Sequence, residues 1–278
     1  ATVAERVRGD IVRGLGLVNA RQLIGSFDRP NLVFRVRRAT QKVKQIKEVI
    51  DRHQGESGIV YCISRAEVEQ MAASLKAAGV KAAPYHAGMP DIARQRNQEA
   101  FIQDRIEVIV ATVAFGMGID KPNVRFVIHA GMPKSLESYV QESGRSGRDG
   151  LEAECLLLFS GADPLLWRRM IEDGEDAARE GALHSLDEMV RFTNAVKCRH
   201  KAIVEYFGQS LERDNCGACD VCLGELKMAP EPLITAQKII SCVARLDQRY
   251  GVGHTTKVLM GSKEQAILNN GHDQLSTY

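Results

Sequence analysis

The sequence predicts an α/β fold in which a parallel sheet has helices on both faces and is followed by a helical region with a metal site. Three observations support this prediction. Short apolar runs alternate with helical patterns between residues 32 and 159, the strand pattern does not return after Asp163, and four cysteines gather between residues 198 and 222. The 278 residues are enough for two domains and part of a third.

Six segments of the first region are short and apolar, as strands are. Four segments between them hold helix formers, with apolar residues three and four positions apart. Strands and helices in alternation are typical of a parallel sheet, whose ligand sites gather at the carboxyl ends of the strands. The predicted strands are Leu32–Arg37, Gly58–Cys62, Lys81–Tyr85, Glu107–Thr112, Arg125–His129 and Glu152–Phe159. The predicted helices are Lys42–Arg52, Glu67–Ala78, Ile92–Phe101 and Leu136–Glu142.

The second region is predicted to be helical. One helix begins at Asp163 and contains the single tryptophan, Trp167, and a helical pair follows over Leu183–Val196 and Arg199–Phe207. After the cysteines, the proline-containing run Met228–Pro232 predicts a linker. The helices predicted beyond it are Leu233–Tyr250, Thr255–Met260 and Glu264–Leu268.

Four cysteines, Cys198, Cys216, Cys219 and Cys222, are spaced as metal ligands are. Tight turns can point the last three sulfurs inward, and Cys198 comes from the preceding helical pair. Four thiolates fit a tetrahedral structural zinc that has no open position for catalysis, and an iron–sulfur cluster is the alternative. The other three cysteines lie in apolar stretches and are predicted to be core residues.

Composition narrows the class of protein further. No apolar run approaches the roughly twenty residues that a membrane-spanning helix needs, and no signal peptide is evident. Because cysteines at metal-ligand spacing favour a reducing compartment, we expect a cytoplasmic protein without a membrane partner. The net charge is only +2, but residues 1–52 hold twelve Lys or Arg against five acids. That imbalance favours a polyanion as partner, and a solvated helix face explains it equally well.

The run from Gln141 to Gly150 carries the strongest functional signal. It places Arg145 and Arg148 three positions apart on a segment with three glycines. A guanidinium matches phosphate oxygens and stays charged, and glycines let the backbone approach a ligand. The residues therefore predict phosphate binding, the alternative being an arginine pair that caps helix carbonyls or faces solvent.

A second run, Ala111–Pro122, comes one short predicted strand earlier, and together the two runs resemble motifs V and VI of superfamily 2 helicases. Their sequences are similar to those of the RecQ DNA helicases in particular. Val60–Arg65 resembles motif IV, and Tyr85–Met89 resembles the segment after it. The cysteine array and the closing run Gly271–Tyr278 extend the resemblance to almost the whole chain.

The resemblance implies four parts. These are a tail of a first RecA-like domain (1–27), a second RecA-like domain (28–160), a helical zinc-binding subdomain (161–228) and a truncated winged-helix domain (229–278). The opening run Ala1–Arg8 resembles the tail of motif III, so we expect the chain to begin within a domain. The 278 residues contain no Gly-x-x-x-x-Gly-Lys-Ser/Thr run and no Asp-Glu-x-His box. We therefore expect this piece alone not to hydrolyse ATP.

The function that the resemblance implies is that of the C-terminal part of an ATP-dependent 3′ to 5′ DNA helicase acting in DNA repair and recombination, associated with the nucleoid in a bacterium. The implied cofactors are structural Zn²⁺, and ATP with Mg²⁺ in the intact enzyme. The implied partners are single-stranded and duplex DNA, ATP, and the first RecA-like domain in cis. One alternative is a non-catalytic zinc-stabilised module that binds DNA or protein. Another is a superfamily 2 RNA helicase, but the cysteine array is evidence against it.

The resemblance also assigns site residues. Arg148 matches the arginine finger on the γ-phosphate, and Arg145 matches a second position on the nucleotide side. Ser64 and His86 also have ordinary structural interpretations, as a helix N-cap and a hydrogen-bonded turn residue. The remaining residues expected near the nucleotide are Gln141, Asp120 and Gly118. The residues expected to contact the sugar-phosphate backbone of DNA are Ser64, Arg65, His86 and Thr112.

Overall fold

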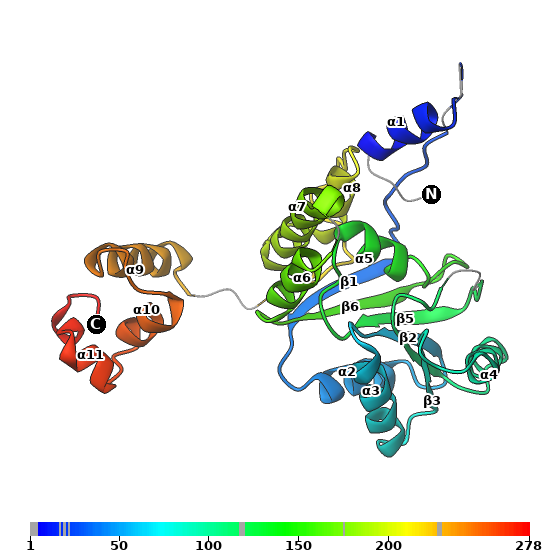
Figure 1. Cartoon of the computed structure of the whole chain (residues 1–278), viewed down its shortest axis with the longest axis horizontal. Helices are drawn as coiled ribbons and strands as arrows, with labels where there is room; N and C mark the ends of the chain where they lie inside the picture. Colours follow the sequence, from blue (N-terminus) through cyan, green and yellow to red (C-terminus); the bar gives the residue numbers. More distant parts are fainter. Residues whose placement is uncertain are drawn as a thin grey trace. The chain divides into compact units, whose positions relative to one another are not determined.

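The computed structural model of the chain (Figure 1) describes residues 5–16, 18, 21, 23–116, 120–174, 176–226 and 230–278, with the backbone alone at residues 5–8 and 176–177. Gly118, Met228 and the first four residues of the opening run lie outside the described residues. The chain divides into two compact units, Ala1–Glu225 and Leu226–Tyr278.

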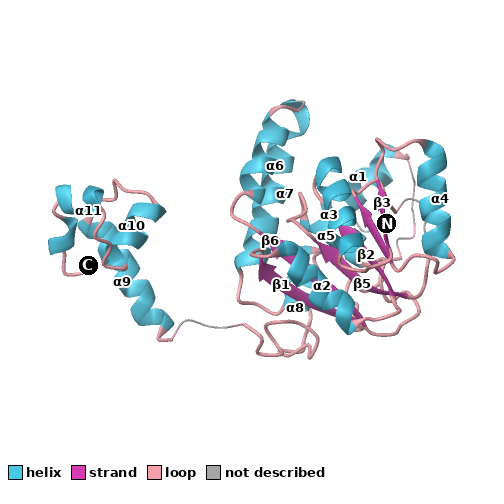
Figure 2. Ribbon diagram, turned by 90° about the horizontal axis from the view of Figure 1, so that it is seen from below, coloured by secondary structure: helices cyan, strands magenta, loops and turns pink. Residues whose placement is uncertain are grey.

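The larger unit is built on one sheet of six parallel strands in the order β1-β6-β5-β2-β4-β3 (Figure 2). Most of the strand residues are buried, because helices cover both faces of the sheet, and such strands have continuous apolar runs. The strands are β1 (Leu32–Arg38), β2 (Ser57–Tyr61), β3 (Ala82–Tyr85), β4 (Val108–Ala111), β5 (Val124–His129) and β6 (Ala153–Phe159).

Successive strand residues point to opposite faces, so each face has its own core. On one face Val60 packs with Val68 and Leu75 of α3, and on the other Phe34 of β1 packs with Phe192 of α7. Helices α2 and α3 lie on the first face and α5, α7 and α8 on the second (Figure 1). The helices of this unit are α1 (Glu5–Gly14), α2 (Lys42–Arg52), α3 (Arg65–Ala77), α4 (Asp91–Ile102), α5 (Leu136–Ser143), α6 (Asp163–Glu172), α7 (Asp176–Asn194) and α8 (Arg199–Tyr206).

The predicted α/β fold class is confirmed. All six predicted strands and the four helices predicted between them are present, and none of their ends differs by more than two residues. Two other helices of the larger unit differ more. The helix predicted over Leu183–Val196 begins earlier, at Asp176, and α1 was not predicted.

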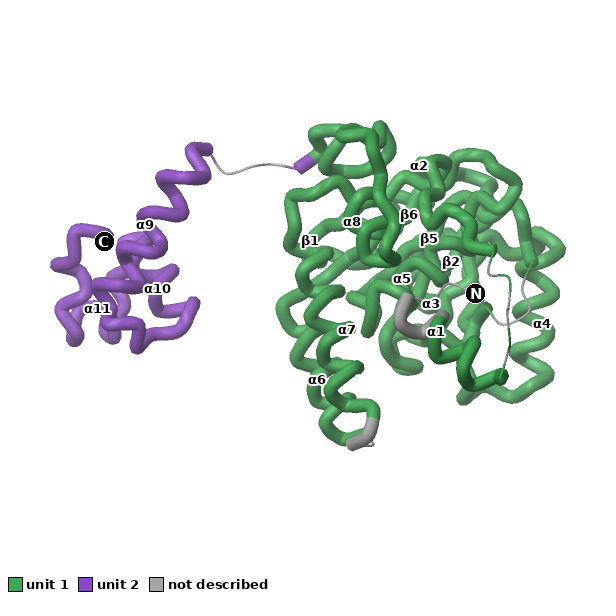
Figure 3. Tube along the Cα trace, turned by 90° about the horizontal axis from the view of Figure 1, so that it is seen from above, with its two compact units in different colours: residues 1–225 green, residues 226–278 purple. Residues whose placement is uncertain are grey.

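The smaller unit (Figure 3) is helical over its described residues and has a small core made by Cys242, Leu246, Val258 and Ile267. Its first helix was predicted to reach Tyr250, but it ends at Arg245. Asp247 and Gln248 have φ angles of 52° and 57°, and two left-handed residues in succession cannot continue an α-helix. The helices are α9 (Pro232–Arg245), α10 (Val252–Leu259), α11 (Gln265–Asn269) and the 3₁₀ helix η1 (His272–Gln274).

Candidate nucleotide, DNA and zinc sites

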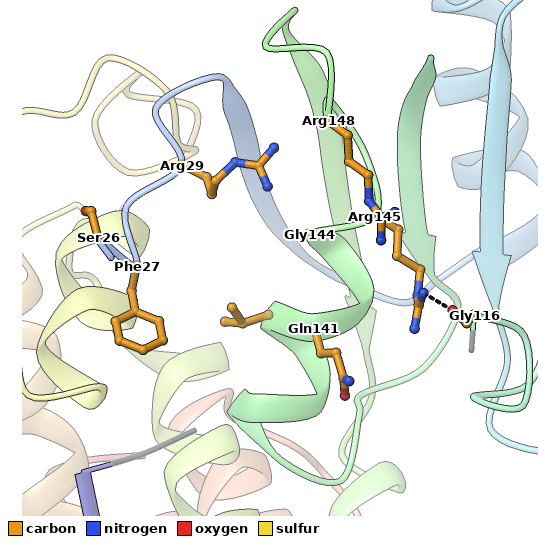
Figure 4. A pocket seen from close by; sticks show the side chains of 9 residues that line it. Ser26, Phe27, Arg29, Gly116, Gln141, Gly144, Arg145 and Arg148 are labelled. Atoms are coloured by element: carbon orange, nitrogen blue, oxygen red, sulfur yellow. Dashed lines mark hydrogen bonds between the residues drawn. The ribbon is translucent and has the colours of Figure 1, made fainter. Parts of the chain in front are cut away.

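The two arginines of the Gln141–Gly150 run line one pocket in the larger unit (Figure 4). The cavity measures about 390 Å³ and is open to solvent on one side. Guanidiniums, an amide and backbone groups of glycines meet around it, which is a chemistry that suits phosphate oxygens. The lining residues are Ser26, Phe27, Arg29, Gly116, Val140, Gln141, Gly144, Arg145 and Arg148.

Arg145 lies across the loop that follows β4. Its Nη1 donates a hydrogen bond to the carbonyl oxygen of Gly116. A β-carbon at Gly116 would lie 2.1 Å from the guanidinium carbon of Arg145, and the φ of 144° there also favours glycine. Gly116 therefore lets the loop pass directly beneath Arg145.

Arg148 forms an ion pair with Asp120, at 2.7 Å between Nη1 and Oδ1. The Asp120 side chain is 85% exposed and that of Arg148 is 33% exposed. A solvent-exposed pair of this kind contributes only about 0–1 kcal/mol, so a phosphate oxygen can replace the carboxylate at little cost. The structure thus brings Gln141, Arg145, Arg148 and Asp120 together, as the sequence predicted of neighbouring nucleotide-side residues.

The arginine loop, residues 144–151, lies at the amino ends of strands. The Gly147 amide donates to the Val124 carbonyl at the start of β5, and the Ala153 amide donates to the Asn31 carbonyl beside the start of β1. Arg125 of β5 also binds Asp149 and lowers the pKa of its carboxyl. This position is opposite to the carboxyl ends, where the sequence analysis expected ligand sites to gather.

The four residues predicted to contact DNA follow β2, β3 and β4, which are neighbours in the sheet. Because these strands are parallel, their carboxyl ends lie at the same end of the sheet, and Ser64, Arg65, His86 and Thr112 follow them there. Two have structural roles. The Ser64 hydroxyl accepts from the Glu67 amide at the start of α3. His86 is buried, with Nε2 2.9 Å from Glu69 Oε1 and Nδ1 3.2 Å from the Gly88 amide nitrogen.

Arg65 and Thr112 are the other two of these residues. Arg65 is exposed beside Gly88, whose missing side chain leaves room for the guanidinium. Thr112 is half-buried and lines a second cavity of about 280 Å³ at the same edge of the sheet. These two residues and the amide groups around them keep the capacity for sequence-independent phosphate contact.

The second cavity contains a buried pair that the sequence analysis missed. His129, at the end of β5, has Nε2 2.8 Å from Glu142 Oε2 on α5, and both side chains are less than 10% exposed. Among the described residues, the Nδ1 of His129 has no hydrogen-bond partner. The sequence offered one sign of this pair, because His129 is the last residue of a predicted buried strand.

The four predicted metal ligands converge. Their sulfur atoms all lie within 4.8 Å of one another, and none forms a disulfide. The Ala218 amide donates to Cys216 Sγ at 3.3 Å and the Cys222 amide to Cys219 Sγ at 3.4 Å. Amide donors of this kind favour the thiolate form, while burial raises the pKa of the Cys222 thiol. Four closely spaced sulfurs with amide donors fit a tetrahedral zinc, and the chain carries a structural zinc site.

The cysteine loop is joined to the edge of the sheet. The Phe34 amide donates to the Ala218 carbonyl, and the Asp220 amide donates to the Phe34 carbonyl. The buried carboxylate of Asp220 also accepts from the Val36 amide and from Arg199 at 2.9 Å. The zinc-binding region thus extends the sheet beyond β1.

Three known domain families match successive parts of the chain. Residues 41–150 match the helicase conserved C-terminal domain, residues 162–223 the RecQ zinc-binding family, and residues 233–278 the RQC domain. All of this chain aligns with an ATP-dependent DNA helicase RecQ of Pasteurella multocida, at 42% identity, and with one of Bacillus subtilis, at 40%. Almost all of it (99%) aligns with ATP-dependent DNA helicase hus2/rqh1 of Schizosaccharomyces pombe at 36% identity.

The chain covers 44% of the Pasteurella protein, 47% of the Bacillus protein and 21% of the Schizosaccharomyces protein. The fold is similar to that of Dbp5 of Saccharomyces cerevisiae, solved bound to RNA and ADP BeF3. That similarity has a TM-score of 0.50 and 18% identity, and covers 66% of this chain and 53% of the other. No helix in the described part of the chain has the length and apolar character that crossing a bilayer requires.

Proposed function

Because this chain belongs to the RecQ family, we propose that it forms part of an ATP-dependent DNA helicase. In this proposal residues 28–160 are the second of two RecA-like motor domains, after a tail of the first over residues 1–27. Residues 161–228 are the zinc-binding subdomain, and residues 229–278 belong to a winged-helix domain. The observation that carries the proposal is the convergence of Arg145 and Arg148 with Gln141 on one open pocket.

In the proposed mechanism, Arg148 is the arginine finger. ATP and Mg²⁺ are held by the first motor domain, and closure of the two domains brings the γ-phosphate to the pocket. The Arg148 guanidinium leaves the Asp120 carboxylate and binds phosphate oxygens instead. Arg145, which is hydrogen-bonded to the Gly116 carbonyl, supplies a second positive charge. Both stabilise the charge that develops on the transferred phosphoryl group. Gln141 orients the nucleotide from α5, and Asp120 lies on its ribose side. Gly118, as a glycine, would let the nucleotide approach the loop closely.

The proposed DNA contacts lie at the carboxyl edge of β2, β4 and β3. Ser64, Arg65, His86 and Thr112 would hold the phosphates of single-stranded DNA through hydroxyls, one guanidinium and neighbouring amides. Movement is 3′ to 5′, with duplex DNA ahead, and the process served is DNA repair and recombination. The protein would then be cytoplasmic, and nucleoid-associated in a bacterium.

The test is DNA-stimulated ATP turnover by a protein that contains both motor domains. Arg148→Ala should lower kcat by about 10³- to 10⁵-fold, as loss of an arginine finger does. Arg38→Ala is the matched control, because Arg38 is an exposed arginine at the far end of β1. Equal turnover by the two variants would refute the role of Arg148. The 278-residue chain alone should not hydrolyse ATP, and addition of the first motor domain should restore turnover.

A further inference from the structure

The segment from Gly25 to Asn31 lies between the zinc-binding helices and the arginine loop. We propose that this segment, called the strap below, positions the arginine loop, and that Arg29 is a positioning residue for ATP hydrolysis. The inference rests on the proposed function, because it assigns a role in the same nucleotide site. Neither Arg29 nor Asn31 belongs to the motifs that the sequence analysis identified.

One side of the strap holds the backbone between the two functional arginines. Arg29 Nη2 donates to the carbonyl oxygens of Gly147, at 2.8 Å, and Ser146, at 3.3 Å. Asn31 Nδ2 donates to the Gly147 and Leu151 carbonyls, both at 2.9 Å. The two carbonyls between Arg145 and Arg148 are therefore fixed by side chains of the strap.

The fit at Gly147 is close. Its φ is 57°, and a β-carbon there would lie 2.5 Å from Asn31 Nδ2. Glycine thus lets the loop adopt a left-handed turn directly against the strap. Because the turn is held from outside, the directions in which Arg145 and Arg148 leave the backbone depend on the strap.

The other side of the strap is held by residues that follow Cys198. Phe27 stacks on Phe207, with 4.3 Å between ring centroids and 8° between ring planes. Gln209 Oε1 accepts from the Phe27 amide, and its Nε2 donates to the Gly25 carbonyl, both at 3.0 Å. These contacts tie the strap to the end of α8.

Asp28 adds two further ties to the same region. Its carboxylate contacts His200 Nδ1 at 2.7 Å and Arg213 Nη2 at 2.6 Å. His200 follows Cys198 on α8, and Arg213 precedes Cys216. The strap is thus anchored on a segment whose two ends are zinc ligands, and it links the zinc site to the arginine loop.

Arg29 also lines the pocket itself, together with Arg145 and Arg148 (Figure 4). Its bonds to Ser146 and Gly147 nevertheless direct part of the guanidinium to the backbone rather than to a ligand. A displacement of about 1 Å at a catalytic group can lower a rate about 100-fold. Loss of Arg29 should therefore reduce turnover more than nucleotide binding.

The first experiment measures steady-state ATP turnover in the protein with both motor domains. Arg29→Ala should lower kcat about 10- to 100-fold and change KM for ATP less than about threefold. Arg29→Lys, which keeps one donor, should recover part of kcat, and Arg38→Ala should match the wild type. Asn31→Asp, which replaces the donor with an acceptor at similar size, should also lower kcat. An unchanged kcat in Arg29→Ala, or a raised KM with normal kcat, would overturn the proposal.

The second experiment does not depend on turnover. Hydrogen exchange of the amides of residues 144–151 is measured in the 278-residue chain. Arg29→Ala and Gln209→Ala should accelerate exchange in this loop about tenfold or more, with zinc content unchanged, and Arg38→Ala should not. Unchanged exchange in both strap variants would refute the strap. If exchange accelerates but the wild-type two-domain protein hydrolyses no ATP, the proposed function fails and the strap stands as a positioning element of this loop alone.

Discussion

Arg145 and Gly116 show how closely the proposed nucleotide pocket is packed. The guanidinium lies so near the loop after β4 that position 116 has no room for a side chain. The pattern Arg-x-x-Arg in the sequence predicted that Arg145 and Arg148 act at one site, and both side chains line one pocket in the structure. Arg29 could not be predicted in the same way, because its partner Gly147 is 118 residues away and only the folded chain brings them together.

Gly116→Ala should therefore affect the pocket in two ways, through the backbone and through Arg145. The alanine would be strained at a φ of 144° and would push Arg145 aside. We expect the free energy of unfolding to fall by about 1–3 kcal/mol and ATP turnover to fall at least about tenfold. Gly79→Ala is the control, because Gly79 has a φ of 83° but open space around it. Similar turnover in the two variants would show that Arg145 needs no space at Gly116.

Glu154 should make the stability of the larger unit depend on pH. Its side chain is 6% exposed and contacts Arg52 at 2.6 Å and His53 at 3.3 Å. Burial by itself would raise the pKa of Glu154, but hydrogen bonds from His53 and Arg52 lower it to about 2. The folded pKa is below the usual 4.5, so the contribution is complete above pH 4.5 and is lost as the pH falls toward 2.

The measurement is urea denaturation at a series of pH values. Between pH 5 and 3 the wild type should lose about 2 kcal/mol from this group, and Glu154→Gln should lose less. His53 acts in the opposite direction, because the hydrogen bond that it donates to Glu154 raises the pKa of His53 above 6.5. Its contribution is complete below pH 6.5 and is lost as the pH rises through the raised pKa. Parallel pH profiles of the wild type and Glu154→Gln would contradict this account.

At the scale of elements, the strands were predictable and some helix ends were not. Most strand residues are buried, so each strand reads as a short, mainly apolar segment of the sequence. The end of α9 depends instead on two left-handed residues, Asp247 and Gln248. Neither is a glycine, so the sequence does not indicate a left-handed turn there. The position of the predicted DNA contacts at the carboxyl ends of strands was evident from the sequence. The position of the arginine loop at the amino ends was not, because it depends on a contact between Gly147 and Val124 that only the folded chain makes.

Zinc removal should affect more than the cysteine loop. The loop is hydrogen-bonded to β1 through Phe34 and Asp220, so its loss should also expose the edge of the sheet. A chelator should lower the thermal midpoint and the helical circular dichroism signal together, since metal binding and folding are coupled in such sites. Cys219→Ser should act in the same way.

Cys155→Ala is the control for that experiment, because Cys155 is buried in β6 outside the cluster. This variant should retain one zinc per chain and lose only the stability that a small cavity costs. Zinc at full occupancy in Cys219→Ser would rule out the assigned ligand set. Iron in the purified protein would restore the iron–sulfur alternative.

At the scale of the whole molecule, the two units have separate cores. The smaller unit has 53 residues, and those described from 230 onward include only four buried apolar residues at its centre, which is marginal for an independent domain. We expect removal of residues 226–278 to leave the zinc content and the main thermal transition of the larger unit nearly unchanged. A shift of more than about 4 °C, which corresponds to a destabilisation of roughly 1–2 kcal/mol at this size, would show that the units depend on each other.

The proposed nucleotide pocket and the cavity lined by Thr112 have walls in common. Helix α5 presents Ser138 and Glu142 to one and Val140 and Gln141 to the other, and the loop 112–116 likewise borders both. A partition one helix thick therefore separates the proposed nucleotide pocket from the proposed DNA edge. Any ligand that rotates or shifts α5 must change the shape of both compartments together, without a long relay through the sheet.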